Sequence, residues 1–344
     1  MEFILYALIT VLILGFLTFI HEFGHFFFAR LFKVPIIEFA VGMGPKLFSW
    51  EGKTGTRYAL RALPIGGFVQ MEGEEGTSDD PNAYNNLSPW KKIIVTAAGP
   101  VVNIIFAIIV CFIIVLTSSY LISTTVGATA EGSALQQYDE IVKVGNVAVH
   151  TGDEAYYEVM MQGYQAVDVT VIRDGKEIVL EDVVFPADKS GKFALRDFIC
   201  YSVKDPTIGD YMKHAFYKAL NNVKLVWDSL IGLVSGRFGM DELSGPVGIV
   251  DQVNDVAQEN KDNPSVISDL LVNLLAVISM NLGIFNLLPI PALDGGRIFF
   301  HLIDGIAGRK VIKKEVEDAI TSVTMILLLI FMFIVSAKDI INLF

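Results

Sequence analysis

The sequence predicts a polytopic α-helical membrane protein with four membrane-spanning helices, β structure between the first two, and an α/β domain between the second and third. Hydrophobic residues make up 53% of the 344 residues and charged residues only 19%, and the mean hydropathy is +0.52. Soluble globular proteins carry about 25% charged residues. The formal net charge of −12, from 26 basic and 38 acidic residues, argues against a nucleic-acid partner.

Four apolar runs have the length of about 17–25 residues that a bilayer span requires. They cover residues 3–28, 93–116, 270–288 and 320–335. The first run leads directly into a polar motif without a small-residue cleavage site, so we interpret it as a retained helix rather than a signal peptide. The alternative of buried core helices in a soluble protein is disfavoured, because so little charged chain remains to cover four such runs.

Basic residues predict the orientation of these spans. They gather between spans one and two and between spans three and four, as Arg30, Lys33, Lys46, Lys53, Arg57, Arg61, Lys91 and Lys92 in the first loop and Arg297, Arg309, Lys310, Lys313 and Lys314 in the second. By the positive-inside rule both loops are cytoplasmic. Both termini and residues 117–269 are then expected outside.

The first loop has the pattern of a small β-sheet. Residues 36–41, 47–50, 56–63 and 68–71 are apolar or alternating, and Gly42, Gly44, Gly66 and Gly67 separate them. An apolar sheet beside membrane helices must be buried in protein or line a cavity. Residues 56–63 alternate and contain no proline, so we take them as the free edge of this sheet.

The outer region begins with an α/β pattern. A helix is expected over residues 153–162, and two alternating strands flank the turn Asp174-Gly175. Residues 207–234 have the period of an amphipathic helix, packed on the domain or lying at the membrane interface. The two cysteines, Cys111 and Cys200, predict neither a disulfide framework nor a cysteine metal site.

The motif His21-Glu22-Phe23-Gly24-His25 is the strongest chemical signal. On a helix, residues i and i+4 share a face, so both imidazoles can reach one metal ion while Glu22 lies beside them. Two histidine ligands with a glutamate general base are typical of zinc hydrolases. The alternative, in which packing satisfies these groups, is costly inside a membrane span, where ionisable residues are functional by default.

Zinc with an open coordination position needs a third protein ligand, and Asp294 is the candidate. It follows Asn286-Leu-Leu-Pro289-Ile-Pro291 at the end of span three. The prolines break the helix, which predicts that Asp294 lies on irregular backbone lining a cavity. The alternatives are a helix-terminal carboxylate for Asp294 and His301 as a competing ligand.

These motifs together resemble the site-2 protease family of intramembrane zinc metalloproteases, and the resemblance covers nearly the whole chain. Gly99-Pro100-x-x-Asn103 in span two belongs to the same pattern. Ser244-Gly245-Pro246-Val247-Gly248-Ile249 and Ser279-Met-Asn281-Leu-Gly283 resemble the bacterial regulator-of-sigma-E branch of that family. The sheet of residues 36–71 resembles the membrane-reentrant β-loop of the family, and residues 126–185 resemble a PDZ domain of the permuted bacterial type.

The resemblance implies a set of site residues. His21, His25 and Asp294 are expected to bind Zn²⁺, with Glu22 as the catalytic base and no small-molecule cofactor. Substrate contacts are assigned to the residues of the span-three motifs, namely Asn281, Asn286, Pro289 and Pro291. Interhelical hydrogen bonding is the alternative for the two asparagines. Asn103 is assigned to helix packing.

The expected organisation follows the chain from end to end. It comprises the first span (1–30), the reentrant β-loop (31–92), the second span (93–117), one extracytoplasmic PDZ domain (118–205), an amphipathic helix with a linker (206–268), the third span (269–296), a cytoplasmic loop (297–319) and the fourth span with the tail (320–344). The expected setting is the bilayer of a bacterial inner membrane, with the active site toward the cytoplasmic leaflet.

The implied activity is proteolysis within single-span membrane substrates, such as anti-sigma factors or remnant signal peptides. The first alternative is an inactive, membrane-anchored PDZ protein that binds peptides. The second alternative is a transporter, which would need polar residues along a full path, and spans two and four offer few.

Overall fold

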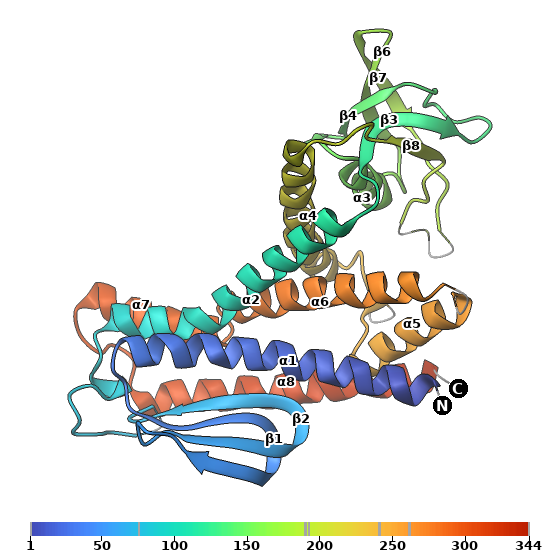
Figure 1. Cartoon of the computed structure of the whole chain (residues 1–344). Helices are drawn as coiled ribbons and strands as arrows, with labels where there is room; N and C mark the ends of the chain where they lie inside the picture. Colours follow the sequence, from blue (N-terminus) through green and yellow to red (C-terminus); the bar gives the residue numbers. More distant parts are fainter. Residues whose placement is uncertain are drawn as a thin grey trace. The chain divides into compact units, whose positions relative to one another are not determined.

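The chain divides into two compact units in the computed structural model, which describes residues 2–74, 76–188, 191, 193–239, 242–260 and 263–342 (Figure 1). Unit 1 comprises Met1–Ala107 and Met240–Phe344, and unit 2 comprises Ile108–Gly239. Helix α2 (Pro89–Thr117) begins in unit 1 and ends in unit 2.

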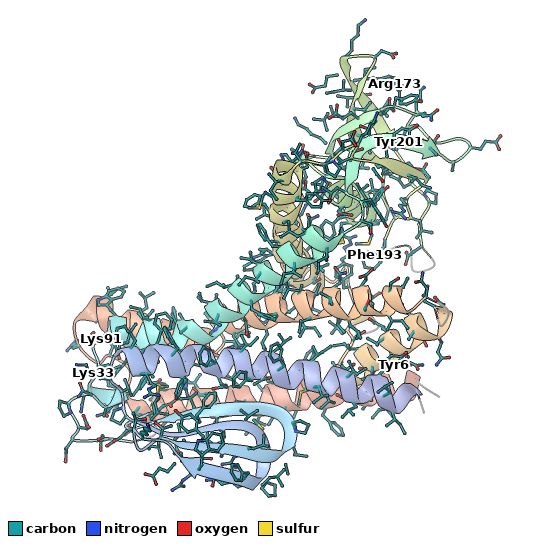
Figure 2. The ribbon with its side chains drawn as sticks, viewed as in Figure 1. Tyr6, Lys33, Lys91, Arg173, Phe193 and Tyr201 are labelled. Atoms are coloured by element: carbon teal, nitrogen blue, oxygen red, sulfur yellow. The ribbon has the colours of Figure 1, made fainter. Side chains whose placement is uncertain are left out.

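Four helices in the described part of the chain are long and apolar enough to cross a membrane, which confirms the predicted polytopic helical class. The candidate spans are Ile4–Leu31 in α1 (Glu2–Leu31), all of α2, Ser265–Leu287 in α6 (Pro264–Leu287) and Lys314–Ile341 in α8 (Lys314–Asn342). Helix α6 ends at Leu287 because Pro289 and Pro291 cannot continue it. Lys33 and Lys91 lie at the same end of unit 1, opposite Tyr6 (Figure 2).

Two further helices complete unit 1. Helix α7 (Asp294–Ala307) occupies much of the stretch expected as a loop over residues 297–319. Helix α5 (Pro246–Glu259) packs against α1, α6 and α8. No side chain of its own caps the start of α5; instead Asp339 of α8 accepts hydrogen bonds from the backbone N–H groups of Gly245 and Gly248, at 2.8 and 3.0 Å. A carboxylate at a helix N-terminus is stabilised by the helix dipole, so this contact ties α8 to α5.

The first loop forms a bent antiparallel sheet of β1 (Ile36–Glu51) and β2 (Arg57–Met71). Residues 36–41 pair with 67–71 on one side and with 57–60 on the other, and 57–61 also pair with 46–51. The prediction that residues 56–63 form the free edge is therefore wrong. Both strands fold back on themselves near Gly42, Gly44 and Gly66, whose φ angles are +80 to +83°, so the edges of this sheet are residues 67–71 and 46–51.

The inner edge of this sheet packs on helix α1. Val69 and Met71 join a buried cluster with Phe39 and Ala29. Gly67 lies against α1, because an added Cβ would stand 3.4 Å from Cγ of Glu22, at van der Waals contact. The same Cβ would stand 2.9 Å from the carbonyl oxygen of Ala40 in the neighbouring strand β1. The edge strand 67–71 therefore runs beside the helix that carries the histidine motif (Figure 1).

Unit 2 contains a six-stranded sheet with one helix packed on its core. In sheet order its main strands are β7 (Lys176–Val183), β6 (Val167–Arg173), β4 (Glu140–Val144), β3 (Ile122–Thr129) and β8 (Phe198–Ser202), and β5 (Val147–Ala148) pairs with β4. The predicted hairpin turn at Asp174-Gly175 is confirmed, with φ of +51° and +74°. Helix α3 (Gly152–Gln162) begins with a capping box between Thr151 and Glu154.

Helix α4 (Ile208–Val234) is the predicted amphipathic helix of unit 2. It contacts α3 through the Tyr157 hydroxyl, which donates to Asp228 at 2.8 Å, and through an ion pair of Lys224 with Glu158. The two cysteines, Cys111 and Cys200, are both buried free thiols.

Candidate metal centre

Two imidazoles meet on one face of α1. His21 and His25 are one turn apart and both are buried, with exposed fractions of 7% and 8%. Their Nε2 atoms are 3.2 Å apart and their rings cross at 78°. Helical spacing alone brings these side chains together, because residues i and i+4 are neighbours on a helix surface.

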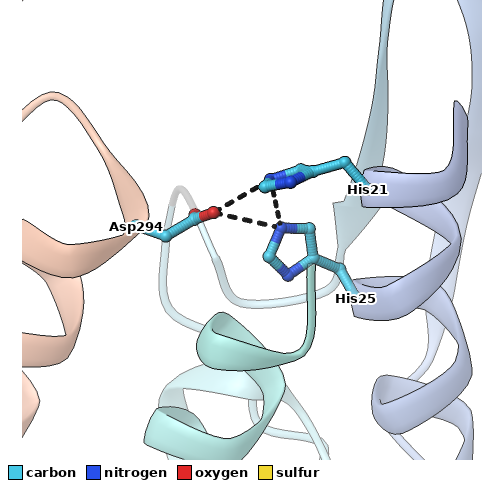
Figure 3. Close-up of side chains that lie close together, drawn as sticks. All are labelled: His21, His25 and Asp294. Atoms are coloured by element: carbon cyan, nitrogen blue, oxygen red, sulfur yellow. Dashed lines mark hydrogen bonds and ion pairs between the residues drawn. The ribbon is translucent and has the colours of Figure 1, made fainter. Parts of the chain in front are cut away.

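Asp294 completes the cluster from a segment more than 250 residues away. Its Oδ2 lies 3.0 Å from Nε2 of His21 and 3.4 Å from Nε2 of His25 (Figure 3). The three side chains can offer ligand atoms within 4.8 Å of one another. Two imidazole nitrogens and one carboxylate oxygen are the donor set of a three-ligand zinc site with one position left open, so these residues fit the ion that the sequence predicts.

The backbone that presents Asp294 differs from the expected irregular loop, because Asp294 is the first residue of α7. The chain between α6 and α7 turns tightly, with hydrogen bonds from Ile290 N–H to the Leu288 carbonyl and from Leu293 N–H to the Ile290 carbonyl. A Cβ added to Gly295 would stand 2.1 Å from the carbonyl oxygen of Leu288. Glycine at this position lets the start of α7 pack directly on the end of α6.

Hydrogen bonds at the far side of each ring indicate its tautomer. His25 Nδ1 lies 2.9 Å from the Val95 carbonyl oxygen. Because a carbonyl only accepts, Nδ1 carries the proton and the lone pair of Nε2 faces Asp294 and His21. A histidine that ligates a metal is commonly oriented by such a bond.

Asn103 of α2 contacts the far side of the His21 ring. Its amide nitrogen lies 3.2 Å from His21 Nδ1, while its Oδ1 is buried without a partner among the described atoms. The oxygen and nitrogen of an amide are assigned by the hydrogen bonds they make. Exchanging them would let Oδ1 accept from His21 Nδ1–H, which removes the orphaned acceptor and leaves the His21 Nε2 lone pair available to a metal. This role goes beyond the helix packing that the sequence predicted.

Helix α2 approaches the two rings through Gly99. A Cβ at this position would stand 2.4 Å from Nε2 of His25 and 2.9 Å from Nε2 of His21. Gly24 of α1 makes the reciprocal approach, since its added Cβ would lie 2.5 Å from the Ala98 carbonyl oxygen. The predicted motif Gly99-Pro100-x-x-Asn103 thus supplies both the close approach and the amide beside His21.

A cavity of about 400 Å³ opens beside the cluster, and we call it the catalytic cavity. Glu22, the predicted base, lines it together with His21, His25 and Asp294. The rest of the wall includes Phe68 and Val69 of the sheet edge, Thr96 of α2, Asn286 of α6 and Arg297 of α7.

The four predicted substrate contacts are placed differently from one another. Asn286 lines the catalytic cavity, and its amide donates to the Leu282 carbonyl at 2.9 Å. Asn281, Pro289 and Pro291 are not among the described residues that line it. Pro291 instead accepts a hydrogen bond from Thr321 of α8 through its carbonyl oxygen, at 3.2 Å. Substrate contact by all four stays a prediction.

His301, the competing ligand, is absent from the cluster that the described residues form. Its Nε2 lies 3.0 Å from the Tyr84 hydroxyl, which also contacts Thr96 at 2.9 Å. Burial, with the positive charges of Lys92 and Arg297 nearby, lowers the pKa of His301 to about 4. Sequence reasoning missed Tyr84 and Arg297, and only Arg297 carried a signal, because it follows Asp294 by one helical turn.

Comparison with known proteins agrees with this geometry. The model of the family described as peptidase family M50 matches residues 9–331. A Clostridium acetobutylicum protein named "Putative zinc metalloprotease" is 37% identical over 97% of this chain and 96% of its own length. Proteins of the same name from Fusobacterium nucleatum and Clostridium perfringens are 34% and 33% identical, each over 98% of this chain and 99% of their own length.

Proposed function

Since this chain belongs to peptidase family M50, the family of site-2 proteases, we propose that it is an intramembrane zinc metalloprotease. Its substrates are single-span membrane proteins, such as anti-sigma factors and remnant signal peptides, cut in regulated intramembrane proteolysis. The observation that carries this proposal is the convergence of His21, His25 and Asp294 beside Glu22, on helices that belong to a bundle of candidate spans. The sequence motifs favour the regulator-of-sigma-E branch of the family.

Each residue of the cluster has a role in this proposal. His21, His25 and Asp294 hold Zn²⁺ through two nitrogens and one oxygen. When bound, the metal polarises the scissile carbonyl group and makes a water molecule reactive at neutral pH. Glu22 takes the proton of the attacking water and returns it to the leaving amine, so the peptide bond breaks with one water consumed. Asn103 and the Val95 carbonyl keep the two rings in the tautomers that bind metal.

The test of this function is a comparison of fragments. The wild type and a Glu22→Gln variant are co-expressed with a panel of tagged single-span proteins, and the products are mapped. We expect cleavage inside the spans by the wild type and a loss of about 10²- to 10⁴-fold in the variant, with its metal retained. Equal cleavage by both proteins would leave Glu22 without the role of base. No cleavage by either, with metal bound, would favour the peptide-binding alternative.

The edge strand 67–71 supports a way to hold an unwound substrate. A helical substrate has its carbonyl groups locked in hydrogen bonds, and once freed they need partners at membrane depth. An extended peptide can add to a sheet edge as one more strand. In this proposal the sheet is the membrane-reentrant β-loop of the family, and its inner edge places the substrate beside Glu22.

Proline in that edge should slow cleavage. Single Pro substitutions at Phe68, Val69 and Gln70 remove one backbone donor each. Because a hydrogen bond contributes about 0.5–1.5 kcal/mol, turnover should fall about 2- to 10-fold wherever the lost donor faces the substrate. The control is Ser49→Pro on the opposite edge of the same sheet. If all three variants keep full activity with metal and expression unchanged, strand addition at this edge does not occur.

The proposal also assigns sides of the membrane. Unit 2 is taken as the PDZ domain, lying outside the cytoplasm, where it filters substrates by the size of their outer portion. The loops rich in basic residues are taken as cytoplasmic in a bacterial inner membrane. Support comes from Lys33 and Lys91, which lie at one end of unit 1 (Figure 2).

Cysteine labelling tests this topology. Lys53→Cys and Lys310→Cys should react with a membrane-impermeant maleimide only from the cytoplasm, and Lys176→Cys only from outside. The native thiols give little background, because both are buried and burial raises the pKa of Cys200 to about 11, so the reactive thiolate is scarce. Labelling of position 53 from outside would invert the orientation.

A further inference from the structure

A second cavity, of about 520 Å³, lies in unit 1 next to the catalytic cavity. The two cavities share four lining residues, Glu74, Tyr84, Arg297 and Thr321. These residues come from the segment after β2, from α7 and from α8. Their side chains therefore form a partition between the cavity that holds the metal cluster and the second cavity.

The partition is closed by an ion pair. Arg297 donates to the Glu74 carboxylate at 2.6 Å, and the Lys314 ammonium donates to the backbone carbonyl of Glu74 at 3.3 Å. Both bonds join side chains to a segment that has no helix or strand at Glu74. The Arg297 side chain keeps 45% of its surface exposed, whereas the Glu74 side chain keeps only 15%. Opening this pair moves two side chains and no helix, and the largely buried Glu74 carboxylate then needs a new hydrogen-bond partner.

The second cavity is lined by charges of both signs. Beyond the partition its wall carries Glu317 and Asp318 of α8 and Arg309 and Lys310 of the connection before it. None of these four side chains has an ion-pair partner within 4.0 Å among the residues that the structure describes. Filling such a cavity with apolar side chains would desolvate these charges without compensation, so a polar and charged occupant fits it.

We propose that the second cavity binds the polar segment that flanks the cleaved span of the substrate, and that the Glu74–Arg297 pair opens to admit this segment. The inference rests on the proposed protease function. A substrate bound beside Glu22 must continue from the catalytic cavity toward water, and the second cavity shares four residues of its wall. Lysine or arginine in the flank would meet Glu317 and Asp318, and acidic residues would meet Arg309 and Lys310.

Photo-crosslinking tests the occupant. A photo-reactive amino acid is placed at Thr77 or Lys310, which line only the second cavity, in the full chain carrying Glu22→Gln so that substrate is not consumed. Position Lys53, which lines neither cavity, is the control. We expect crosslinks from positions 77 and 310 to the flank of a tagged single-span substrate. Crosslinking no stronger than at position 53 would overturn the proposal.

Substrate flanks test the specificity. Replacing charged flank residues by serine at constant length should lower kcat/KM by about 2- to 5-fold for each charge removed. Unchanged kcat/KM would show that the charges of the second cavity do not contribute to recognition of the flanking segment. A lowered and an unchanged kcat/KM are both measured with active enzyme. Either result therefore differs from failure of the proposed protease function, in which no substrate is cut.

A reversible lock tests the partition. Glu74→Cys with Arg297→Cys is bridged by a reducible bis-methanethiosulfonate reagent, and reduction reopens it. Cleavage of the flanked substrate should fall at least about 10-fold when bridged and recover on reduction, and the loss should be smaller for a short peptide without a flank. If the bridge leaves the flanked substrate unaffected, or slows both substrates by the same factor, the pair is not the entrance for the flank.

Discussion

Asp294→Ala should lose zinc and activity together. The wild type is expected to bind about one zinc ion per chain through three protein ligands, and Asp294 supplies the oxygen that lies 3.0 and 3.4 Å from the two imidazoles. Two histidines alone leave two coordination positions open, so affinity should fall far enough for the metal to be lost during purification. Metal analysis of the purified chain and cleavage of a single-span substrate measure the two effects.

The control is Asp304→Ala on the same helix. Asp304 caps the connection to α8 by accepting from the Val311 N–H at 2.8 Å, and it lies outside the metal cluster. That variant should keep its zinc. Full zinc retention in Asp294→Ala would remove Asp294 from the ligand set and leave the cluster without a third protein ligand.

Gly99→Ala should abolish activity although it changes only one methyl group. The new Cβ would stand 2.4 Å from Nε2 of His25 and 2.9 Å from Nε2 of His21, so either α2 retreats or both rings rotate. A displacement of about 1 Å in a catalytic group can cost about 10²-fold in rate. We expect a loss of at least that size, accompanied by loss of metal.

Helix propensity and packing have opposite effects on the folding stability of this variant. Alanine is favoured over glycine inside a helix by about 1 kcal/mol, but overpacking a buried contact costs about 1–3 kcal/mol, so we expect the loss of activity without a gain in thermal stability. Gly209→Ala in α4 is the matched control, because Gly209 is also helical and the nearest atom to an added Cβ there, Oγ1 of Thr207, stands at 3.4 Å. Activity of Gly99→Ala within about twofold of wild type would show that the rings tolerate a closer α2.

The spans and the histidine pair could be predicted from the sequence, because helical periodicity and the length of an apolar run depend only on residues that are close together in the chain. Asp294 could be predicted as a ligand for a similar reason, because two nearby prolines indicate where α6 ends. What failed was the order of segments in the β1–β2 sheet. The sequence places bends at Gly42, Gly44 and Gly66 but does not say which segments then become neighbours, so residues 57–61 were taken for an edge although they pair on both sides.

The contact of Asn103 with the His21 ring could not be predicted from the sequence, for a different reason. It depends on how closely α2 approaches α1, and that distance is set by Gly24 and Gly99 acting across two helices. The partition between the cavities is similar: Glu74 and Arg297 are more than 200 residues apart. No periodicity connects such residues, whereas a folded chain brings them within hydrogen-bonding distance.

The position of helix α8 depends on the surrounding lipid or detergent more than the positions of the other spans do. Only 6% of its most apolar window is buried by protein, against 39% for α2, and apolar packing gains little in lipid because acyl chains are equally apolar. Among its described hydrogen bonds, Asp339 accepts from the backbone at the start of α5, and the Thr321 hydroxyl donates to the carbonyl of Pro291, shortly before Asp294. A detergent micelle that loosens α8 would therefore release the turn that carries Asp294 while every helix stays intact, so circular dichroism would report a folded protein whose activity had already gone.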